Sequence, residues 1–216
     1  MKVIDFGSMK KILIANPKGG VGKSTLSTNL AGWFAKNGKR VMLGDTDRQQ
    51  SSRAWLSIRS PALPFIASWD IQAGHPARPP KDTTHVVLDT PAGLHGKKLT
   101  QLLKLVDNVI VPLQPSLFDI FATSVFLDEL VATKQYRKEA IRIGVVGMRV
   151  DQHTRASGEL ERFLEKTGLP VIAHLRNAQS YVQAAAHGMT IFDLPESRAG
   201  KDWEQWEPLL RWVDPV

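Results

Sequence analysis

Residues 16–25, Asn-Pro-Lys-Gly-Gly-Val-Gly-Lys-Ser-Thr, constrain this chain more than any other stretch. The apolar run 12–15 leads into them, and a segment with apolar residues on one helical face, 26–35, follows. Glycines let successive backbone N–H groups point at one anion, and a helix that begins there presents its positive end to the same anion. The order of strand, glycine-rich loop and helix therefore predicts a phosphate-binding loop.

The polar residues of this loop suit a nucleoside triphosphate with Mg²⁺. Lys23 is expected to reach the β- and γ-phosphates, Ser24 to offer its hydroxyl to the cation, and Thr25 to contact a neighbouring phosphate. The common pattern G-x-x-x-x-G-K-[ST] has glycine where this chain has Pro17, and here a second lysine, Lys18, enters the loop. The alternative is a glycine-rich turn that binds nothing, which the register of the lysines, glycines and hydroxyls disfavours.

This loop resembles the deviant Walker A motif, K-G-G-x-G-K-[ST], of the ParA/MinD family of ATPases. In that family the first lysine contacts the phosphates bound by the other subunit of a nucleotide sandwich dimer, so the resemblance implies this catalytic role for Lys18. It also implies ATP and Mg²⁺ as ligands. The implied nucleotide-binding residues of the loop are Lys18, Gly19, Gly20, Val21, Gly22, Lys23, Ser24 and Thr25.

Three aspartates follow predicted strands. Asp45 and Asp47 come after the apolar segment 40–44, and Asp89 ends the apolar segment 85–88. Ligand groups gather at the carboxyl ends of strands in open parallel sheets, so these carboxylates are expected beside the loop. Asp89 is typical of a Walker B motif, with Mg²⁺ as its target, and Gly93 permits a mobile switch.

The resemblance extends to the first two aspartates, because ParA-like proteins carry D-x-D-P-Q at this point. It implies that Asp45 lies near the hydration shell of Mg²⁺ and that Asp47 orients the attacking water. Arg48 stands where the family usually has proline, which leaves the path of the loop open. A solvated acidic turn is the alternative interpretation.

Strands and helices alternate along the rest of the chain. Further strands are expected at 65–69, 108–113, 141–149 and 171–175, and further helices at 51–60, 99–106, 118–133, 159–166 and 180–187. The alternation predicts an α/β fold of the P-loop NTPase type, with a twisted, mainly parallel sheet and helices on both faces. The length of 216 residues favours one domain, 9–216, after a leader or extension, 1–8.

Two later segments bear on the nucleotide and on membranes. Arg149, at a strand end, and Pro195, in a later turn, resemble the positions that flank adenine in ParA-like proteins, although Arg149 could equally be a surface or interface arginine. The C-terminal segment 201–214 repeats apolar residues but carries four acidic residues against two basic ones. Because its polar face is acidic, this segment is expected to pack on the protein's own core and not on an anionic bilayer.

Composition narrows the class of protein. There is no cysteine, which excludes disulfides and the iron–sulfur relatives of these ATPases. No apolar run reaches membrane-spanning length and no signal peptide is evident, so a cytoplasmic protein is expected. The net charge of +7 favours a polyanionic partner. The expected phosphate contacts to DNA are Lys134, Arg137, Lys138, Arg142, Arg155, Arg162, Lys166 and Arg176.

The favoured hypothesis is a small ParA-like partition or positioning ATPase. Its ATP-bound homodimer would bind DNA without sequence preference on the nucleoid, and a ParB-like or other cargo adaptor would stimulate hydrolysis. A plasmid, a chromosome or a protein assembly such as the carboxysome all fit as cargo. The alternatives are a MinD-like membrane-associated regulator, disfavoured by the acidic tail, and a metabolic P-loop enzyme of the dethiobiotin-synthetase kind.

Overall fold

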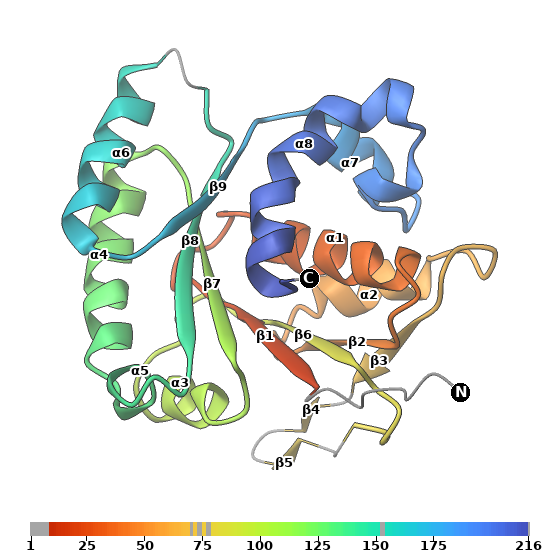
Figure 1. Ribbon diagram of the computed structural model, residues 1–216, viewed down its shortest axis with the longest axis horizontal. Helices are drawn as coiled ribbons and strands as arrows, with labels where there is room; N and C mark the ends of the chain where they lie inside the picture. Colours follow the sequence, from red (N-terminus) through yellow and green to blue (C-terminus); the bar gives the residue numbers. More distant parts are fainter. Residues whose placement is uncertain (1–8, 70, 73–74, 77–78, 152–153, 216) are drawn as a thin grey trace.

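The computed structural model describes residues 9–69, 71–72, 75–76, 79–151 and 154–215. Seven parallel strands form one sheet in the order β3-β2-β6-β1-β7-β8-β9 (Figure 1). Their bounds are β1 Lys10–Ile14, β2 Val41–Asp45, β3 Ile66–Trp69, β6 His85–Asp89, β7 Asn108–Leu113, β8 Arg142–Met148 and β9 Val171–Leu175. Two further short strands, β4 (Ile71–Gln72) and β5 (His75–Pro76), pair antiparallel. The predicted α/β sheet of the P-loop NTPase type is confirmed. The expected leader, 1–8, lies outside the described residues.

Helices cover both faces of the sheet. One face carries α1 (Lys23–Lys36), α2 (Ser51–Ser57), α7 (Gln179–Ala185), the 3₁₀ turn η1 (Ile191–Asp193) and α8 (Glu196–Val213). The other carries α3 (Gly96–Leu103), α4 (Leu117–Val131), α5 (Lys134–Arg137) and α6 (Arg155–Thr167). Each layer closes over its own hydrophobic cluster.

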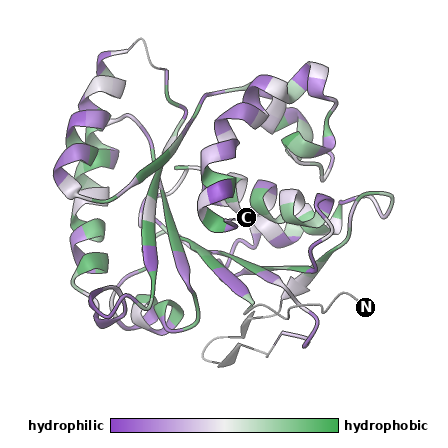
Figure 2. Ribbon diagram, in the orientation of Figure 1, coloured by the Kyte–Doolittle hydropathy of each residue, from purple (hydrophilic) through white to green (hydrophobic). Residues whose placement is uncertain are grey.

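Alternation along the strands produces these two clusters. In β1, Ile12 and Ile14 join the cluster under α1 and α8, whereas Leu13 joins the cluster under α4. In β6, Val87 faces the first cluster, and its neighbours Val86 and Leu88 face the second. Successive side chains of a strand point to opposite faces, and both faces are buried here, which explains the nearly continuous apolar runs (Figure 2).

Three helices begin at least three residues earlier than the sequence pattern indicates. Helix α3 begins at Gly96 and not at residue 99. Helix α1 begins at Lys23, so the lysine and hydroxyl residues of the loop form its first turn. Helix α6 begins at Arg155, because the side chain of Thr154 accepts a hydrogen bond from the backbone N–H of Ser157 and caps the helix. Polar first turns lack the apolar periodicity by which a helix is recognised in the sequence.

The C-terminal helix packs on the protein's own core, as expected. Trp206, Leu209 and Val213 of α8 are fully buried among the residues under α1 and β9. The indole N–H of Trp206 donates to the hydroxyl of Tyr181 at 2.8 Å. Within the described part of the chain, no helix combines the length and apolar character needed to cross a bilayer.

Strand register brings the predicted phosphate-binding residues together at one edge of the sheet. Ile14 of β1 lies opposite Asp89 of β6, and Asp89 lies opposite Asp45 of β2. Because these strands are parallel, the loops that leave their carboxyl ends meet at that edge. The glycine-rich loop and two of the three predicted aspartates are therefore neighbours.

Candidate phosphate-binding site

Backbone geometry requires glycine in the loop between β1 and α1. Gly20 has φ 76° and Gly22 has φ 98°, in the region that L side chains rarely adopt. A Cβ at Gly22 would also lie 2.6 Å from Cε of Met148, at the end of β8. The loop therefore packs against β8 in a conformation that brings its backbone close to the first turn of α1.

A buried asparagine anchors the entrance to the loop. Nδ2 of Asn16 donates to the backbone oxygen of Pro112 at 2.7 Å and to Oγ1 of Thr123 at 3.0 Å. Its Oδ1 accepts the backbone N–H of Lys18 at 2.9 Å. No role was predicted for Asn16, although its position between a buried strand and the loop was an available signal.

Two further contacts tie the loop to neighbouring strand ends. Nε2 of Gln114, after β7, donates to the backbone oxygen of Gly20 at 2.8 Å. The backbone N–H of Gly93, after β6, donates to the backbone oxygen of Pro17 at 2.8 Å. The segment that was predicted to act as a switch is thus in direct contact with the glycine-rich loop.

The two lysines of the loop occupy different environments. Lys23 is buried, and its Nζ donates to the backbone oxygen of Lys18 at 2.6 Å. Burial lowers the pKa of Lys23, while the negative charges of Asp89 and Asp47 oppose that shift. Lys18 is more exposed, and its Nζ lies 3.4 Å from Oδ1 of Asp119 in the first turn of α4.

Asp89 is almost fully buried and incompletely paired. Its Oδ2 accepts a hydrogen bond from the hydroxyl of Ser52, but among the described residues its Oδ1 has no hydrogen-bond partner. Burial raises the pKa of Asp89, and the hydroxyls of Ser52, Ser24 and Ser27 oppose this effect. A buried carboxylate oxygen without a donor fits a site for a cation or for a water bound to one.

Asp45 and Asp47 organise the loop after β2. The oxygens of Asp45 accept the backbone N–H groups of Asp47 and Ser52, both at 2.9 Å, so Asp45 holds the start of α2. Oδ1 of Asp47 accepts the backbone N–H of Gln49 at 3.0 Å. The carboxylate of Asp45 thus fixes the loop that carries Asp47 to the site.

A cavity of about 470 Å³ opens over the loop. Its lining residues are Gly19, Gly20, Gly22, Lys23, Ser24, Thr25, Asp47, Gln49, Ser51, Thr90, Pro91, Ala92 and Arg149. Most of the predicted nucleotide contacts therefore share one cavity, and Arg149 joins them although it lies more than a hundred residues away in the sequence. Thr90, whose hydroxyl donates to the backbone oxygen of Ile14 at 2.8 Å, was not predicted.

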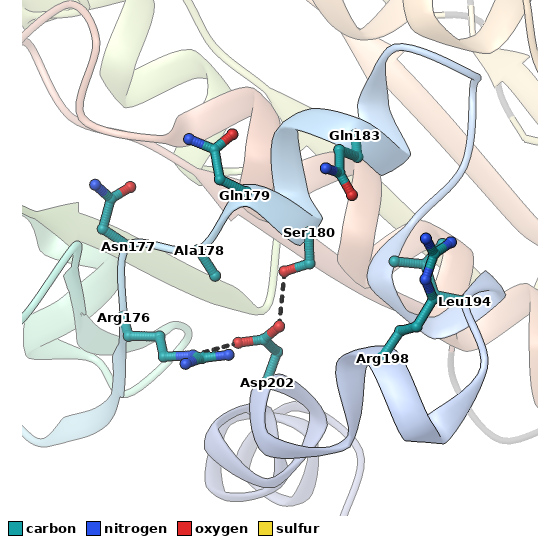
Figure 3. A pocket seen from close by; sticks show the side chains of 9 residues that line it. All are labelled: Arg176, Asn177, Ala178, Gln179, Ser180, Gln183, Leu194, Arg198 and Asp202. Carbon is teal, nitrogen blue, oxygen red and sulfur yellow. Dashed lines mark hydrogen bonds and ion pairs between the residues drawn. The ribbon is translucent and has the colours of Figure 1, made fainter.

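Three predicted nucleotide contacts, Lys18, Val21 and Pro195, do not line this cavity. Val21 is buried. Pro195 caps the start of α8 and is adjacent to Leu194, which lines a second cavity of about 380 Å³ (Figure 3). In that cavity the buried carboxylate of Asp202 accepts from Arg176 at 2.6 Å and from Ser180 at 2.7 Å. Among the described residues, no cluster of three or more histidine or acidic side chains could hold a metal.

The predicted DNA contacts lie on several elements. Lys134, Arg137, Lys138 and Arg142 lie in and after α5, at the amino-terminal end of β8, whereas Arg155 begins α6 beyond the carboxyl end of β8. Arg142 stacks on Trp212, with its guanidinium 4.2 Å from the ring centre, and Arg176 pairs with Asp202. On α6, Glu159, Glu161 and Glu165 balance the basic residues. The most basic part of the predicted set surrounds α5.

Comparison with known proteins agrees with this geometry. Residues 12–191 match the family described as CobQ/CobB/MinD/ParA nucleotide binding domain. The chain belongs to this family. Its members in the ParA/MinD branch are P-loop ATPases that form ATP-dependent dimers and work with partner proteins.

Individual relatives span most of the chain. "Maintenance of carboxysome distribution protein A" of Halothiobacillus neapolitanus is 27% identical over 191 residues, which cover 85% of this chain and 87% of that protein. The MinD cell division protein of Aquifex aeolicus has a similar structure, with a TM-score of 0.72 and 17% identity over 96% of this chain and 98% of that one. An ATP complex of a McdA variant from Cyanothece gives a TM-score of 0.71 and 17% identity over 93% and 96% of the respective chains.

Proposed function

We propose that this chain is a ParA-like ATPase that binds ATP with Mg²⁺ and forms a sandwich dimer in its presence. The dimer binds DNA without sequence preference, and a partner protein stimulates hydrolysis and release. The nucleoid in the cytoplasm is the proposed location. The cavity over the loop carries the proposal, because it gathers Lys23, Ser24, Thr25 and Asp47 at the start of α1 and the half-paired carboxylate of Asp89 lies beside it.

The residues present fit Mg²⁺ as well as the nucleotide. Ser24 and the free oxygen of Asp89 are the proposed protein contacts to the cation, directly or through water, and Asp45 is proposed to act through water. Two or three protein oxygens would suffice, because Mg²⁺ in proteins is commonly bound by one or two carboxylates together with substrate phosphates and water. When bound, the cation neutralises charge on the β- and γ-phosphates. Lys23 contributes a second positive charge there.

Hydrolysis requires an oriented water molecule. In the proposed reaction the water oxygen bonds to the γ-phosphorus while the bond from that phosphorus to the β–γ bridging oxygen breaks, giving ADP and inorganic phosphate. Asp47 lines the cavity and is proposed to orient the water through its carboxylate. Lys18 is proposed to stabilise the developing charge from the other subunit, as its counterpart does in the family.

The burial of α8 supports DNA over a bilayer as the proposed partner. In the MinD-like alternative an amphipathic C-terminal helix would present its apolar face to lipid. Here Trp206, Leu209 and Val213 of α8 are buried in the core, so the apolar face of this helix is not accessible to lipid. We favour DNA, with the basic residues around α5 as contacts, and a protein assembly resembling the carboxysome as the first cargo to test, given the relatives named for it.

Steady-state ATP hydrolysis with and without double-stranded DNA, and with and without anionic vesicles, tests this proposal. Gel shifts on two unrelated duplexes in ATP or ADP, across a salt series, complete it. We expect binding in ATP alone, equal on both duplexes, and falling steeply with salt because phosphate contacts release counterions. Equal binding in ADP, or vesicle binding without DNA binding, would contradict the proposal.

A lysine variant tests the nucleotide site by itself. Lys23→Ala removes the cation that is proposed to contact the β- and γ-phosphates, so calorimetry should detect no binding of ATP at concentrations that saturate the wild type. Lys36→Ala, in the last turn of the same helix, is the matched control. Wild-type affinity in Lys23→Ala would refute the assignment of the loop.

A further inference from the structure

Helix α4 carries an exposed apolar surface. Four side chains form it, which we call the α4 surface: Leu117, Phe118, Phe121 and Val125, with exposed fractions of 53%, 77%, 62% and 67%. Residues three and four apart lie on the same face of a helix, so these side chains are adjacent. They make up half of the large hydrophobic residues that are exposed in the described part of the chain.

The size of this surface sets it apart from ordinary exposed side chains. An aromatic side chain has about 150–250 Å² to bury, so these four residues together expose roughly 400 Å². Single exposed hydrophobic residues are normal, but contiguous apolar patches of several hundred Å² mark sites of interaction. A stable interface buries about 800 Å² on each partner, so the α4 surface supplies about half of one.

The α4 surface begins at the phosphate-binding loop. The turn before α4 contributes Gln114, which holds the backbone of Gly20, and the first turn of α4 contributes Asp119, which pairs with Lys18. Any molecule that faces the cavity over the loop therefore also approaches the first turns of α4. The apolar side chains and the charged cavity are parts of one continuous face.

We propose that a second copy of this chain buries the α4 surface in the ATP-bound dimer; this inference rests on the proposed function. Around a two-fold axis the same patch serves both subunits and must be complementary to itself. Between residues 117 and 125 the only charged residue is Asp119, which Lys18 already pairs, and acidic residues return at Asp128 and Glu129. Two such apolar patches can therefore pack against each other without bringing unpaired like charges together.

The proposed contact of Lys18 makes this association depend on the nucleotide. Lys23 and Arg149 line each cavity together with the carboxylate of Asp47, and Lys18 pairs with Asp119 beside it. The polyphosphate of ATP adds the negative charge that attracts Lys18 of the facing copy. The α4 surfaces then come together and exclude water, and Lys18 leaves Asp119 for the phosphates of the other subunit.

The double variant Phe118→Ser/Phe121→Ser tests this inference, with Phe65→Ser as matched control. Phe65 is 82% exposed but precedes β3, at an edge of the sheet remote from α4. Light scattering over a range of protein concentrations, in a non-hydrolysable ATP analogue with Mg²⁺, gives the dimer dissociation constant. We expect the double variant to raise it at least tenfold and the control to leave it unchanged. Calorimetric affinity for the analogue, measured at protein concentrations where the wild type is still a monomer, should stay within about threefold, since the side chains lie outside the cavity.

A second variant and the wild type distinguish a failure of the α4 proposal from a failure of the proposed function. Val125→Lys places like charges at the same interface and should also raise the dissociation constant, more so at low salt. Wild-type dimerisation in both variants would overturn the α4 proposal and leave the ATP-dependent dimer intact, as would a defect confined to stimulation by a partner protein. Failure of the wild type to dimerise would instead refute the proposed function on which this inference rests.

Discussion

Gly22→Ala is expected to destabilise the nucleotide-free protein through local strain. The φ of 98° at Gly22 lies in a region that costs an L residue about 1–3 kcal/mol. The added Cβ would also lie 2.6 Å from Cε of Met148, the mobile end of a flexible side chain that can partly withdraw. Together these effects predict a loss of about 2 kcal/mol in the free energy of unfolding, or about 5 °C in Tm.

Urea denaturation followed by circular dichroism measures this loss. Gly19→Ala is the control in the same loop, because Gly19 has no positive φ and no atom within 4 Å of an added Cβ. We expect the control to differ from the wild type by less than about 0.5 kcal/mol. Equal stability of Gly22→Ala and Gly19→Ala would refute the argument that backbone geometry, and not composition alone, requires glycine next to Lys23.

Three further substitutions test other parts of the structure. Asp193→Ala leaves the buried guanidinium of Arg59 without the carboxylate that lies 2.9 Å away, and should cost about 3–5 kcal/mol in urea denaturation; a loss under about 1 kcal/mol would contradict it. Burial lowers the pKa of His85 to about 4, so the unfolded chain binds more protons at pH 5. The free energy of unfolding should therefore fall by about 2 kcal/mol between pH 7 and pH 5, and His85→Gln should lack this decrease. The same dependence on pH in the wild type and in His85→Gln would disprove the assignment to His85. Asp89→Asn should reduce the gain in ATP-analogue affinity that Mg²⁺ provides by about tenfold, as measured by calorimetry, and an unchanged gain would remove Asp89 from the cation site.

The fold and the centre of the site were predictable because their signals are local. The loop residues from Lys18 to Thr25 are contiguous, and Asp45 and Asp89 each end an apolar strand, so strand order alone brings them together. The boundaries of α1 and α6 were less predictable, because the polar first turns of these helices lack an apolar stripe. The cap at Thr154 belongs to a helix whose pattern becomes visible only further along.

Contacts between residues distant in the sequence could not be predicted. Asn16 donates a hydrogen bond to Thr123, which lies 107 positions further along the sequence. Lys18 pairs with Asp119, which belongs to α4. The basic residues between Lys134 and Arg176 are close in the sequence, but β8 separates Arg142, at its amino-terminal end, from Arg155, beyond its carboxyl end. The exposure of Phe118 and Phe121 depends on how α4 is rotated about its axis, which its almost uniformly apolar first turns leave undetermined.

The ATP-dependent dimer is the central claim, and light scattering of Lys18→Ala in a non-hydrolysable ATP analogue with Mg²⁺ tests it most directly. The wild type should change from 24.0 kDa to twice that mass. Lys18→Ala should bind the analogue yet remain at the mass of one chain, because its contact to the other subunit is missing. A Lys18→Ala protein that dimerises as the wild type does would contradict the account.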